Sequence, residues 1–499
     1  MTDASASAAQ PQHDEEAARR LDTRILRGSG WVAVGYGGRQ VLTLVSMLVL
    51  VRLVEPKAFG LVALASPFLI ALQYLQESGL GSALIHRRQD VSRAASTVLV
   101  YSPVAAAVLY GAAFASAPLL ARLFHAPQLL EVLRVLALLV VIRSLSVVPS
   151  ALLERELKFA ARAVVELSAV VAQFALSIAL AFAGFGVWSL VFGQLAGEAA
   201  STLVYWLRSP MRPSPRHASL RLLRELTRYG RFVSAANLLN LLNSTADSLV
   251  IGRVLGATQL GFYSVAYRLG TMPGTVIGYI VGRVMFSVYS TLQHDIAAVR
   301  RVYLQNLQRI AIFALPAGVL LVVAARPIVH GLLGEQWSPA IVPLRLVALF
   351  GLSRAFLGPS GELFRGLGRP HLNVILGFAY AVLVVPALLL LVPTVGLAGG
   401  PLAFLIGQLA AGVPAFVISA RMLGLSAREL ATALAAPAAP SAFLAVVLLV
   451  AVQLTRSVTP LVSLLIVVVL GLAVYAAAAA LFARSVIVPM WASLRARGA

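Results

Sequence analysis

The residues that could bind a polar ligand form stripes along apolar segments of the chain. The segment "NLLNLLNSTAD" (237–247) places Asn237, Asn240, Asn243, Ser244 and Asp247 among leucines. An α-helix turns about 100° per residue, so these side chains share about one third of its circumference. Such a stripe is typical of an amphipathic helix in a soluble protein or of a membrane helix with a hydrated face.

The composition favours the membrane helix. Of the 499 residues, 60% are hydrophobic and 12% are charged, whereas a soluble globular protein has about 25% charged residues. We therefore predict an all-α polytopic membrane protein with about 14 transmembrane helices, each near the roughly 20 residues that a bilayer requires. The expected spans are 31–53, 60–78, 97–120, 129–150, 163–183, 186–206, 231–255, 260–289, 305–330, 339–361, 372–392, 396–420, 430–454 and 461–483.

The placement of the 40 Lys and Arg residues indicates the orientation. Most of them fall in segments on one side of the predicted spans, and the positive-inside rule makes that side and both termini cytoplasmic. The basic segment 208–231 is expected to lie against anionic lipid, and an arm that binds nucleic acid is the less favoured alternative. No nucleic-acid partner is predicted.

The chain also repeats itself. "VRLVEPKAFG" (51–60) and "GRVLGATQLG" (252–261) share Arg and Gly at a spacing of 201 residues, and "RVLALLVVIRSLSVVPSALLER" (134–155) resembles "RLVALFGLSRAFLGPSGELFR" (345–365). A repeat with an even number of helices gives two copies of the same orientation, related by a pseudo-two-fold axis along the membrane normal. Two parallel six-helix repeats around a central cavity are expected, followed by two C-terminal helices. The expected divisions are a cytoplasmic tail at 1–28, a six-helix lobe at 29–207, a basic cytoplasmic linker at 208–230, a second lobe at 231–421, two further helices within 422–483 and a cytoplasmic tail at 484–499.

The opening stripe has a counterpart in the first repeat. Arg39, Thr43 and Ser46 share one face of the first predicted helix, at positions equivalent to Asn240, Ser244 and Asp247. Small polar residues also favour close helix packing, but an arginine and an aspartate in a membrane usually face a cavity or a partner. The helices that follow add polar side chains to the expected central cavity. These are Gln73 and Glu77 in the first repeat, and Arg268, Thr275, Tyr279 and Arg283 in the second.

Other arginines have competing interpretations. Arg134 and Arg345 lie near helix ends, where a long side chain can reach the interface. Arg52 and Arg253 are expected at a helix end. Arg143 and Arg354 are deeper and could pair with acidic residues, namely Glu166, Glu198 or Glu362.

Catalytic motifs are not found. The chain has no cysteine, and its seven histidines have no metal-ligand spacing. No cofactor, metal or catalytic residue is therefore predicted.

The three arginines of the expected cavity, Arg39, Arg268 and Arg283, suit phosphate oxygens, which a guanidinium binds in bidentate fashion. The amides, hydroxyls and phenol suit a sugar.

Residues 27–90 resemble the start of bacterial polysaccharide flippases of the Wzx type. The resemblance rests on the turn "RLVEPKAFG" (52–60), one residue longer than the family pattern between Leu and Pro, and on "ESGLGSALI" (77–85) and "ELKF" (156–159). It covers most of residues 25–425. It implies membership of the multidrug/oligosaccharidyl-lipid/polysaccharide exporter superfamily. Its members have two six-helix lobes around a central cavity, and they move polyprenyl-pyrophosphate-linked saccharides outward by alternating access.

The predicted function is therefore a bacterial inner-membrane flippase for lipid-linked oligosaccharide repeat units, in exopolysaccharide, O-antigen or capsule biosynthesis. Membrane lipids, a glycan polymerase and a chain-length regulator are the expected partners. Asp247 could pair with an arginine or hold a coupling proton, and Glu77 is a second gating or ion-coupling candidate. The alternatives are a lipid II flippase or a drug/cation antiporter of the same superfamily. A membrane polysaccharide polymerase or ligase would belong to another class and would need long external loops.

Overall fold

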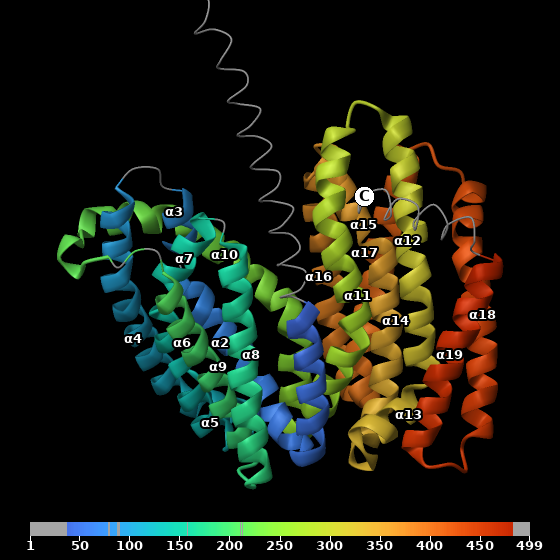
Figure 1. Ribbon diagram of the computed structural model, residues 1–499, viewed down its shortest axis with the longest axis horizontal. Helices are drawn as coiled ribbons and strands as arrows, with labels where there is room; N and C mark the ends of the chain where they lie inside the picture. Colours follow the sequence, from blue (N-terminus) through green and yellow to red (C-terminus); the bar gives the residue numbers. More distant parts are fainter. Residues whose placement is uncertain are drawn as a thin grey trace, which may run out of the picture. The chain divides into compact units, whose positions relative to one another are not determined.

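A computed structural model of the chain describes residues 37–482, apart from 78–79, 87–89, 157, 210 and 212. Within these residues the regular elements are helices (Figure 1). The chain divides into two compact units, Met1–Thr245 and Ala246–Ala499. The division falls inside α10 (Leu220–Val254), a helix of 35 residues.

The first unit is built from helices of very different lengths. It contains a helix at 37–53, α2 (Pro56–Glu77), α3 (Leu80–His86), α4 (Val91–Leu123), α5 (Leu129–Leu136), α6 (Leu138–Ser144), α7 (Val147–Arg155), α8 (Phe159–Phe182), α9 (Val187–Arg208) and the 3-10 turn η1 (Pro215–His217). The helices α8 and α9 pack side by side, because Gly193 and Gly197 of α9 lie against the backbone of α8.

The second unit has the same kinds of element and two long helices in addition. It contains α11 (Ala257–Thr291), α12 (Ile296–Val323), α13 (Ala325–Ile328), the π-helical turn η2 (Val329–Leu333), the 3-10 turn η3 (Glu335–Ala340), α14 (Ile341–Leu357), α15 (Pro359–Gly366), α16 (His371–Val395), the 3-10 turn η4 (Gly396–Ala398), α17 (Gly399–Met422), α18 (Ala427–Leu454) and α19 (Pro460–Phe482).

The described residues contain eight helical stretches that are long and apolar enough to cross a membrane. They become nine if the pair Leu129–Ser144 and Val147–Arg155, bent by 46°, is one span. One of the eight, His371–Met422, has 52 residues and contains both α16 and α17. The prediction of an all-helical polytopic membrane protein is confirmed, and the number of fourteen spans stays a prediction.

The helix bounds of the two units repeat at nearly constant spacings. The helix at 37–53 and α10 end 201 residues apart, and α2 and α11 begin 201 residues apart. Asp90 and Asp295, which precede α4 and α12, are 205 apart. The starts of α8 and α16, and those of α9 and α17, are 212 apart. The spacing between equivalent helices of the two units therefore increases from 201 to 212 residues, which short insertions explain.

The basic segment 208–231 is partly helical. The helix α10 begins at Leu220, inside the stretch expected to be a linker. Leu222 is buried in an apolar cluster with residues of α3, α4 and α7. The backbone N–H of Ser219 donates to Thr97 Oγ1 of α4 at 3.2 Å. This part of the basic segment thus packs on the first unit.

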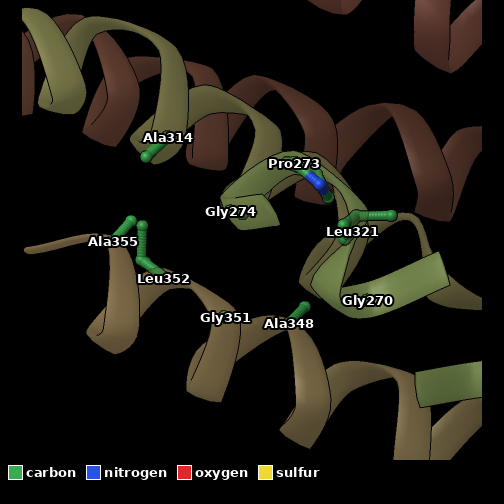
Figure 2. A pocket seen from close by; sticks show the side chains of 10 residues that line it. Gly270, Pro273, Gly274, Ala314, Leu321, Ala348, Gly351, Leu352 and Ala355 are labelled. Carbon is green, nitrogen blue, oxygen red and sulfur yellow. The ribbon is translucent and has the colours of Figure 1, made fainter. Parts of the chain in front are cut away.

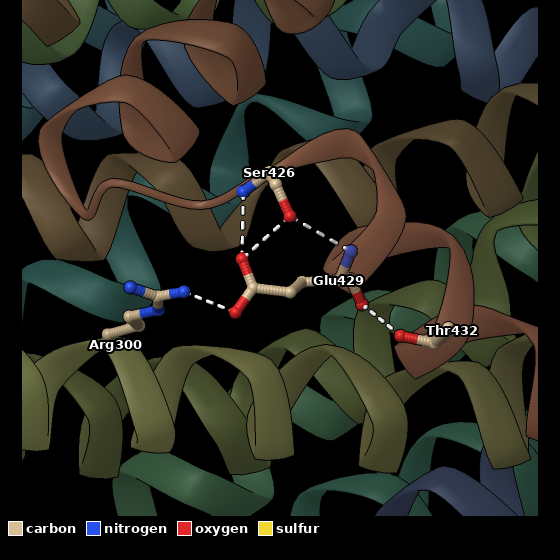
Figure 3. Close-up of polar contacts among 4 residues, drawn as sticks. All are labelled: Arg300, Ser426, Glu429 and Thr432. Atoms are coloured by element: carbon tan, nitrogen blue, oxygen red, sulfur yellow. Dashed lines mark hydrogen bonds and ion pairs between the residues drawn. The ribbon is translucent and has the colours of Figure 1, made fainter.

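The helix pair α18–α19 contacts α12 at two places, near the start of α12 and near its middle. A capping box of Ser426 and Glu429 begins α18, and Arg300 of α12 pairs with the same carboxylate (Figure 3). Further along α12, Pro316 has no N–H to bond to the carbonyl of Ile312. The Tyr475 hydroxyl of α19 donates to that carbonyl at 2.6 Å. A donor from a neighbouring helix is what lets proline persist in a membrane helix.

Two prolines of the first unit are compensated in the same way. Pro118 leaves the Phe114 carbonyl without its helical donor, and Arg134 Nε donates to it at 3.4 Å. The guanidinium of Arg134 also lies 3.9 Å from the Phe114 ring centroid. Trp206 Nε1 donates, at 2.9 Å, to the carbonyl that Pro149 leaves at the break between α6 and α7. Arg134 therefore has a local structural role.

Candidate functional site

The predicted site residues of the first unit lie on two helices. Arg39 is exposed, Thr43 is partly exposed and Ser46 is buried on the helix at 37–53. Gln73 is partly exposed on α2. The neighbouring Gln76 is buried inside the unit, where its amide donates to Ser102 Oγ at 3.2 Å. The stripe thus runs from an exposed arginine to a buried serine.

The stripe of α10 can be followed at Asn237, Ser244 and Asp247. Asn237 is partly buried, Ser244 is exposed and Asp247 is buried. The side chains of Asn240, Asn243, Tyr279, Arg283 and Glu77 lie outside the part of the chain that the structure describes.

On α11, Arg268 and Thr275 are both exposed. The hydroxyl of Thr275 donates to the Thr271 carbonyl at 2.9 Å, and that of Thr271 donates to the Tyr267 carbonyl at 2.7 Å. A hydroxyl that donates within its own helix can only accept from a ligand. This face of α11 therefore offers acceptors from its hydroxyls and donors from its arginine, as a sugar phosphate requires.

Asp247 has a partner that the sequence did not suggest. It is 2% exposed, and Tyr263 of α11 donates its hydroxyl to Asp247 Oδ2 at 2.6 Å. Within the described residues, Asp247 Oδ1 has no hydrogen-bond partner. The turn between α10 and α11 could have revealed this pair. Asp247 lies seven residues before the end of α10, and Tyr263 six residues after the start of α11.

Further aromatic rings pack beside the tyrosine that donates to this carboxyl group. The ring centroids of Tyr263 and Tyr267 are 5.8 Å apart, and Phe404 of α17 lies 6.2 Å from Tyr267. A Cβ atom on Gly400 of α17 would lie 3.2 Å from the Tyr263 ring, so the absence of a side chain there lets α17 approach. A buried carboxyl group bonded to one phenol can hold either a charge or a proton, at a high desolvation cost for the charge.

The deeper arginines have acidic or aromatic surroundings. Arg143 lies with Glu166 and Glu198 within electrostatic range of Tyr205 on α9. Glu166 forms an ion pair at 3.4 Å with Arg162. In the second unit Glu362, one of the acidic residues that the deeper arginines could have paired with, pairs with Arg365, three residues along the same helix.

A small apolar pocket lies where α11, α12 and α14 meet (Figure 2). It is lined mostly by small residues, among them Gly270, Gly274 and Gly351. A Cβ atom on Gly274 would lie 3.1 Å from the Gly351 carbonyl oxygen, so the two backbones are in contact. Pro273 also removes one hydrogen bond from α11 here. The helix that bears Arg268 and Thr275 therefore has a weakened backbone between them.

Comparison with known proteins places this geometry in a family. The profile of a family described as "Polysaccharide biosynthesis protein" matches residues 49–342. The chain is 27% identical over 413 residues to the lipopolysaccharide biosynthesis protein WzxC of Escherichia coli (strain K12), covering 82% of this chain and 84% of that protein.

Two solved structures share the fold. The lipid II flippase MurJ in an inward-closed conformation has a TM-score of 0.71 at 14% identity, covering 91% of this chain and 99% of that one. A multidrug resistance MATE family transporter of the MOP superfamily, inward-facing, has a TM-score of 0.61 at 20% identity, covering 77% and 94%. At these identities the likeness concerns the fold alone.

Proposed function

Since the chain belongs to the polysaccharide biosynthesis protein family, as a membrane transporter of that family and not an enzyme, we propose that it is a lipid-linked oligosaccharide flippase. The cargo is a polyprenyl-pyrophosphate-linked repeat unit for exopolysaccharide, O-antigen or capsule. The observation that supports this cargo best is the exposure of Arg39 and Arg268, which lie on two predominantly apolar helices. An exposed guanidinium there favours an anionic headgroup.

The proposed architecture is two parallel six-helix lobes with the cargo site between them, and fourteen spans in all. The repeated helix bounds support it, because short insertions alone relate the two series. The division at 29–207, 208–230 and 231–421 is proposed with the same lobes. Both termini are proposed to lie in the cytoplasm of a bacterial cell, with the protein in the inner membrane.

In the proposed cycle, Arg39, Arg268 and Arg283 hold the pyrophosphate in an inward-open cavity. The amides of the α10 stripe and the hydroxyl oxygens of α11 contact sugar. Rocking of the lobes then exposes the headgroup on the other side. Asp247 and Glu77 are the proposed gating or ion-coupling residues, and Tyr263 is a positioning residue for Asp247.

The transport step can be tested by following the lipid-linked saccharide in cells that lack this chain. We expect the saccharide to accumulate on the cytoplasmic leaflet, so that intact spheroplasts protect it from a membrane-impermeant oxidant or lectin. Restoring the chain should restore access from outside. Access at the wild-type rate without the chain would overturn the proposal. A block in peptidoglycan synthesis in its place would favour the lipid II alternative, and a changed drug sensitivity alone would favour the antiporter.

The cargo site can be tested with arginine variants. Arg39→Ala and Arg268→Ala each remove a charge-assisted contact of about 1.5–3 kcal/mol, which weakens binding roughly tenfold to a hundredfold. Export should fall accordingly while the protein stays abundant in the membrane. Lysine should rescue partly, because it keeps the charge and loses the planar fork. Arg134→Lys is the control, since Arg134 contacts Phe114 and should affect abundance before export. Normal export by both alanine variants would place the cargo elsewhere.

Orientation can be tested with reporter fusions. Fusions within 209–217 and at Arg495 should report cytoplasm, and a fusion at Thr394 should report the outside. A periplasmic signal from either of the first two would contradict the fourteen-span topology.

A further inference from the structure

Side chains of other helices hold the break between α6 and α7 in the first unit. The two helices are bent by 46°, so the regular helical hydrogen bonds are interrupted here. Ser102 of α4 donates its hydroxyl to the Ser144 carbonyl at 3.3 Å. Thr202 of α9 donates to the Ile142 carbonyl at 3.4 Å, and Trp206 of α9 donates to a third carbonyl at 2.9 Å. The carbonyls at the break are therefore compensated from two neighbouring helices.

Gln76 of α2 extends this network. Its amide donates to Ser102 Oγ at 3.2 Å, so the hydroxyl that holds the Ser144 carbonyl is itself held. Gln76 and Ser102 are 1% and 0% exposed. In secondary transporters a broken helix often binds ions or substrate with the carbonyls that it frees. Here side chains occupy these carbonyls, which suits a mechanical role better than a binding role.

The second unit has a proline at the same place and no comparable bend. Pro149 and Pro359 occupy equivalent positions, but the corresponding run of the second unit, Glu335–Gly366, is a single apolar stretch. The proline alone therefore does not explain the bend. The two units differ in the donors that surround it.

The four side-chain donors of the first unit have apolar equivalents in the second. By the spacings of 201, 205 and 212 residues between equivalent helices, these are Ile277 for Gln76, Leu307 for Ser102, Pro414 for Thr202 and Ile418 for Trp206. None of the four equivalents has a side-chain donor. The first unit thus has a bend together with the donors that satisfy it, and the second unit has neither a bend of this size nor these donors.

The helix α4 is weakened beside the break. Pro103 directly follows Ser102 and leaves the Leu99 carbonyl without its helical donor. Its equivalent in α12 is Gln308, so the second unit lacks a proline at this place. Two neighbouring helical runs can therefore change direction at one level, α4 at Pro103 and α6–α7 at Ser144. The hydrogen bond from Ser102 joins these two points.

The elements on one side of these points pack as a group. Residues of α3, α4, α7 and α10 share a single apolar cluster, whose members from α4 all precede Ser102. Val147 and Val148 belong to it directly after the break. Arg155 Nη1, at the end of α7, donates to the Leu84 carbonyl of α3 at 3.4 Å. We call α3, α7 and the starts of α4 and α10 the end body, which lies at one end of the first unit (Figure 1).

We propose that Pro103 and the break between α6 and α7 form a hinge, on which the end body tilts against the rest of the first unit. The end body includes the start of α10, the helix that carries the polar stripe to Asp247. In the proposed cycle, a tilt moves this stripe and so changes its contact with the sugar. That role in transport rests on the proposed function, whereas the tilt itself does not.

Spin labels on the purified full-length protein test the hinge without a transport assay. Ser92→Cys labels the end body and Val171→Cys labels α8 outside it, at exposed positions of a chain that has no cysteine. Ser92 lies ten residues before Ser102. An arm of about 15 Å that turns by about 20° moves the label by about 5 Å.

The distance between the two labels can be measured by pulsed electron–electron double resonance in lipid nanodiscs. We expect two maxima, or a distribution at least twice as wide as that of a control pair. Leu119→Cys with Val171→Cys is this control pair, because both positions are exposed and lie outside the end body. A single distribution as narrow as that of the control pair would overturn the hinge.

Two proline variants provide a matched comparison within α4. Pro103→Ala restores the donor to the Leu99 carbonyl, and should narrow the Ser92–Val171 distribution to the width of the control pair. Pro118→Ala makes the same change in α4 away from the break, and should leave the distribution unchanged. Equal effects of the two variants would overturn the hinge. Trp206→Phe removes a donor from the break and should widen the distribution. If Trp206→Phe does not fold, the two proline variants still decide.

Export measurements separate the hinge from the proposed function. Pro103→Ala should lower export severalfold more than Pro118→Ala does. Two label distances in a chain that moves no lipid-linked saccharide would leave the hinge and overturn the proposed function. Export at the wild-type rate by a chain with a single, narrow label distance would overturn the hinge and leave the proposed function.

Discussion

The two helical hairpins that begin the two units have matching bounds and different interiors. By the spacing of 201 residues, Ser46 and Val62 of the first hairpin correspond to Asp247 and Tyr263 of the second. Ser46 and Asp247 are both buried, but only Asp247 has a hydrogen-bonded phenol beside it. A hairpin of this length therefore folds with a serine and a valine at these positions. The acid and the tyrosine serve something other than the fold.

The largest effect on stability is expected when an aspartate is introduced into the first hairpin without a tyrosine to donate to it. Ser46→Asp places a carboxyl group at a position that is 8% exposed, and Val62, at the position equivalent to Tyr263, has no side-chain donor. An uncompensated buried charge costs about 3–5 kcal/mol. We expect most of the protein to be lost from the membrane, measured by detergent-extracted yield and by its thermal transition.

The matching double variant sharpens this comparison. Ser46→Asp with Val62→Tyr should recover part of the yield, because the phenol can donate as it does in the second hairpin. If the single variant is as stable as the wild type, water reaches residue 46 and the two hairpins differ less than their burial indicates.

The next effect is expected from removing the donor in the second hairpin. Tyr263→Phe leaves the Asp247 carboxylate without its hydroxyl, and a hydrogen bond to a charged group contributes about 1.5–3 kcal/mol. Tyr475→Phe is the control, because its hydroxyl donates to a neutral carbonyl and should contribute about 0.5–1.5 kcal/mol. Equal shifts of the two thermal transitions would mean that Asp247 is protonated in the folded protein.

A smaller effect is expected at Gly400, which closes the second hairpin from α17. Gly400→Ala brings a Cβ atom to 2.9 Å from Ile251 Cδ1 and 3.2 Å from the Tyr263 ring. Both neighbours can shift a little, so we expect a loss of about 1 kcal/mol. Gly111→Ala, which meets nothing within 4 Å, should be neutral or slightly stabilising. If Gly400→Ala and Gly111→Ala have identical thermal transitions, α17 does not pack tightly against the Asp247–Tyr263 pair.

The smallest difference is expected in chemical access. Ser46→Cys and Asp247→Cys, in a chain with no cysteine, should both react with a membrane-impermeant thiol reagent in one transport state. Their burial predicts slow labelling, measured as the labelled fraction over time in energised and de-energised cells. If both resist in every condition, the paired stripes are packing and the cavity proposal fails.

The sequence predicted what depends on local pattern. The apolar runs predicted the helices, and the pairs Arg52–Arg253 and Arg143–Arg354 predicted the repeat that the helix bounds now support. Contacts between side chains on different helices were harder to predict from the sequence. The polar stripe identified Asp247. Its partner Tyr263 lies on the next helix, and the turn between α10 and α11 brings the two side chains together.

The break between α6 and α7 was also missed, since the run 129–150 is apolar enough to be read as one continuous span. Its bend of 46° comes with a proline whose carbonyl Trp206 compensates. Periodicity reports which face of a helix is polar. It does not report which helix lies opposite, or where a carbonyl has lost its donor.

The contact between Tyr475 and the carbonyl of Ile312 has a consequence for the history of the chain. Without α19, the carbonyl that Pro316 leaves bare would have no compensating hydroxyl, a costly state in lipid. Pro316 therefore depends on the last two helices, which are not easily lost while the proline is present. Relatives that lack α18 and α19 should have a residue other than proline at this position, and a shortened form of this chain should tolerate the loss of these helices better with Pro316→Ala.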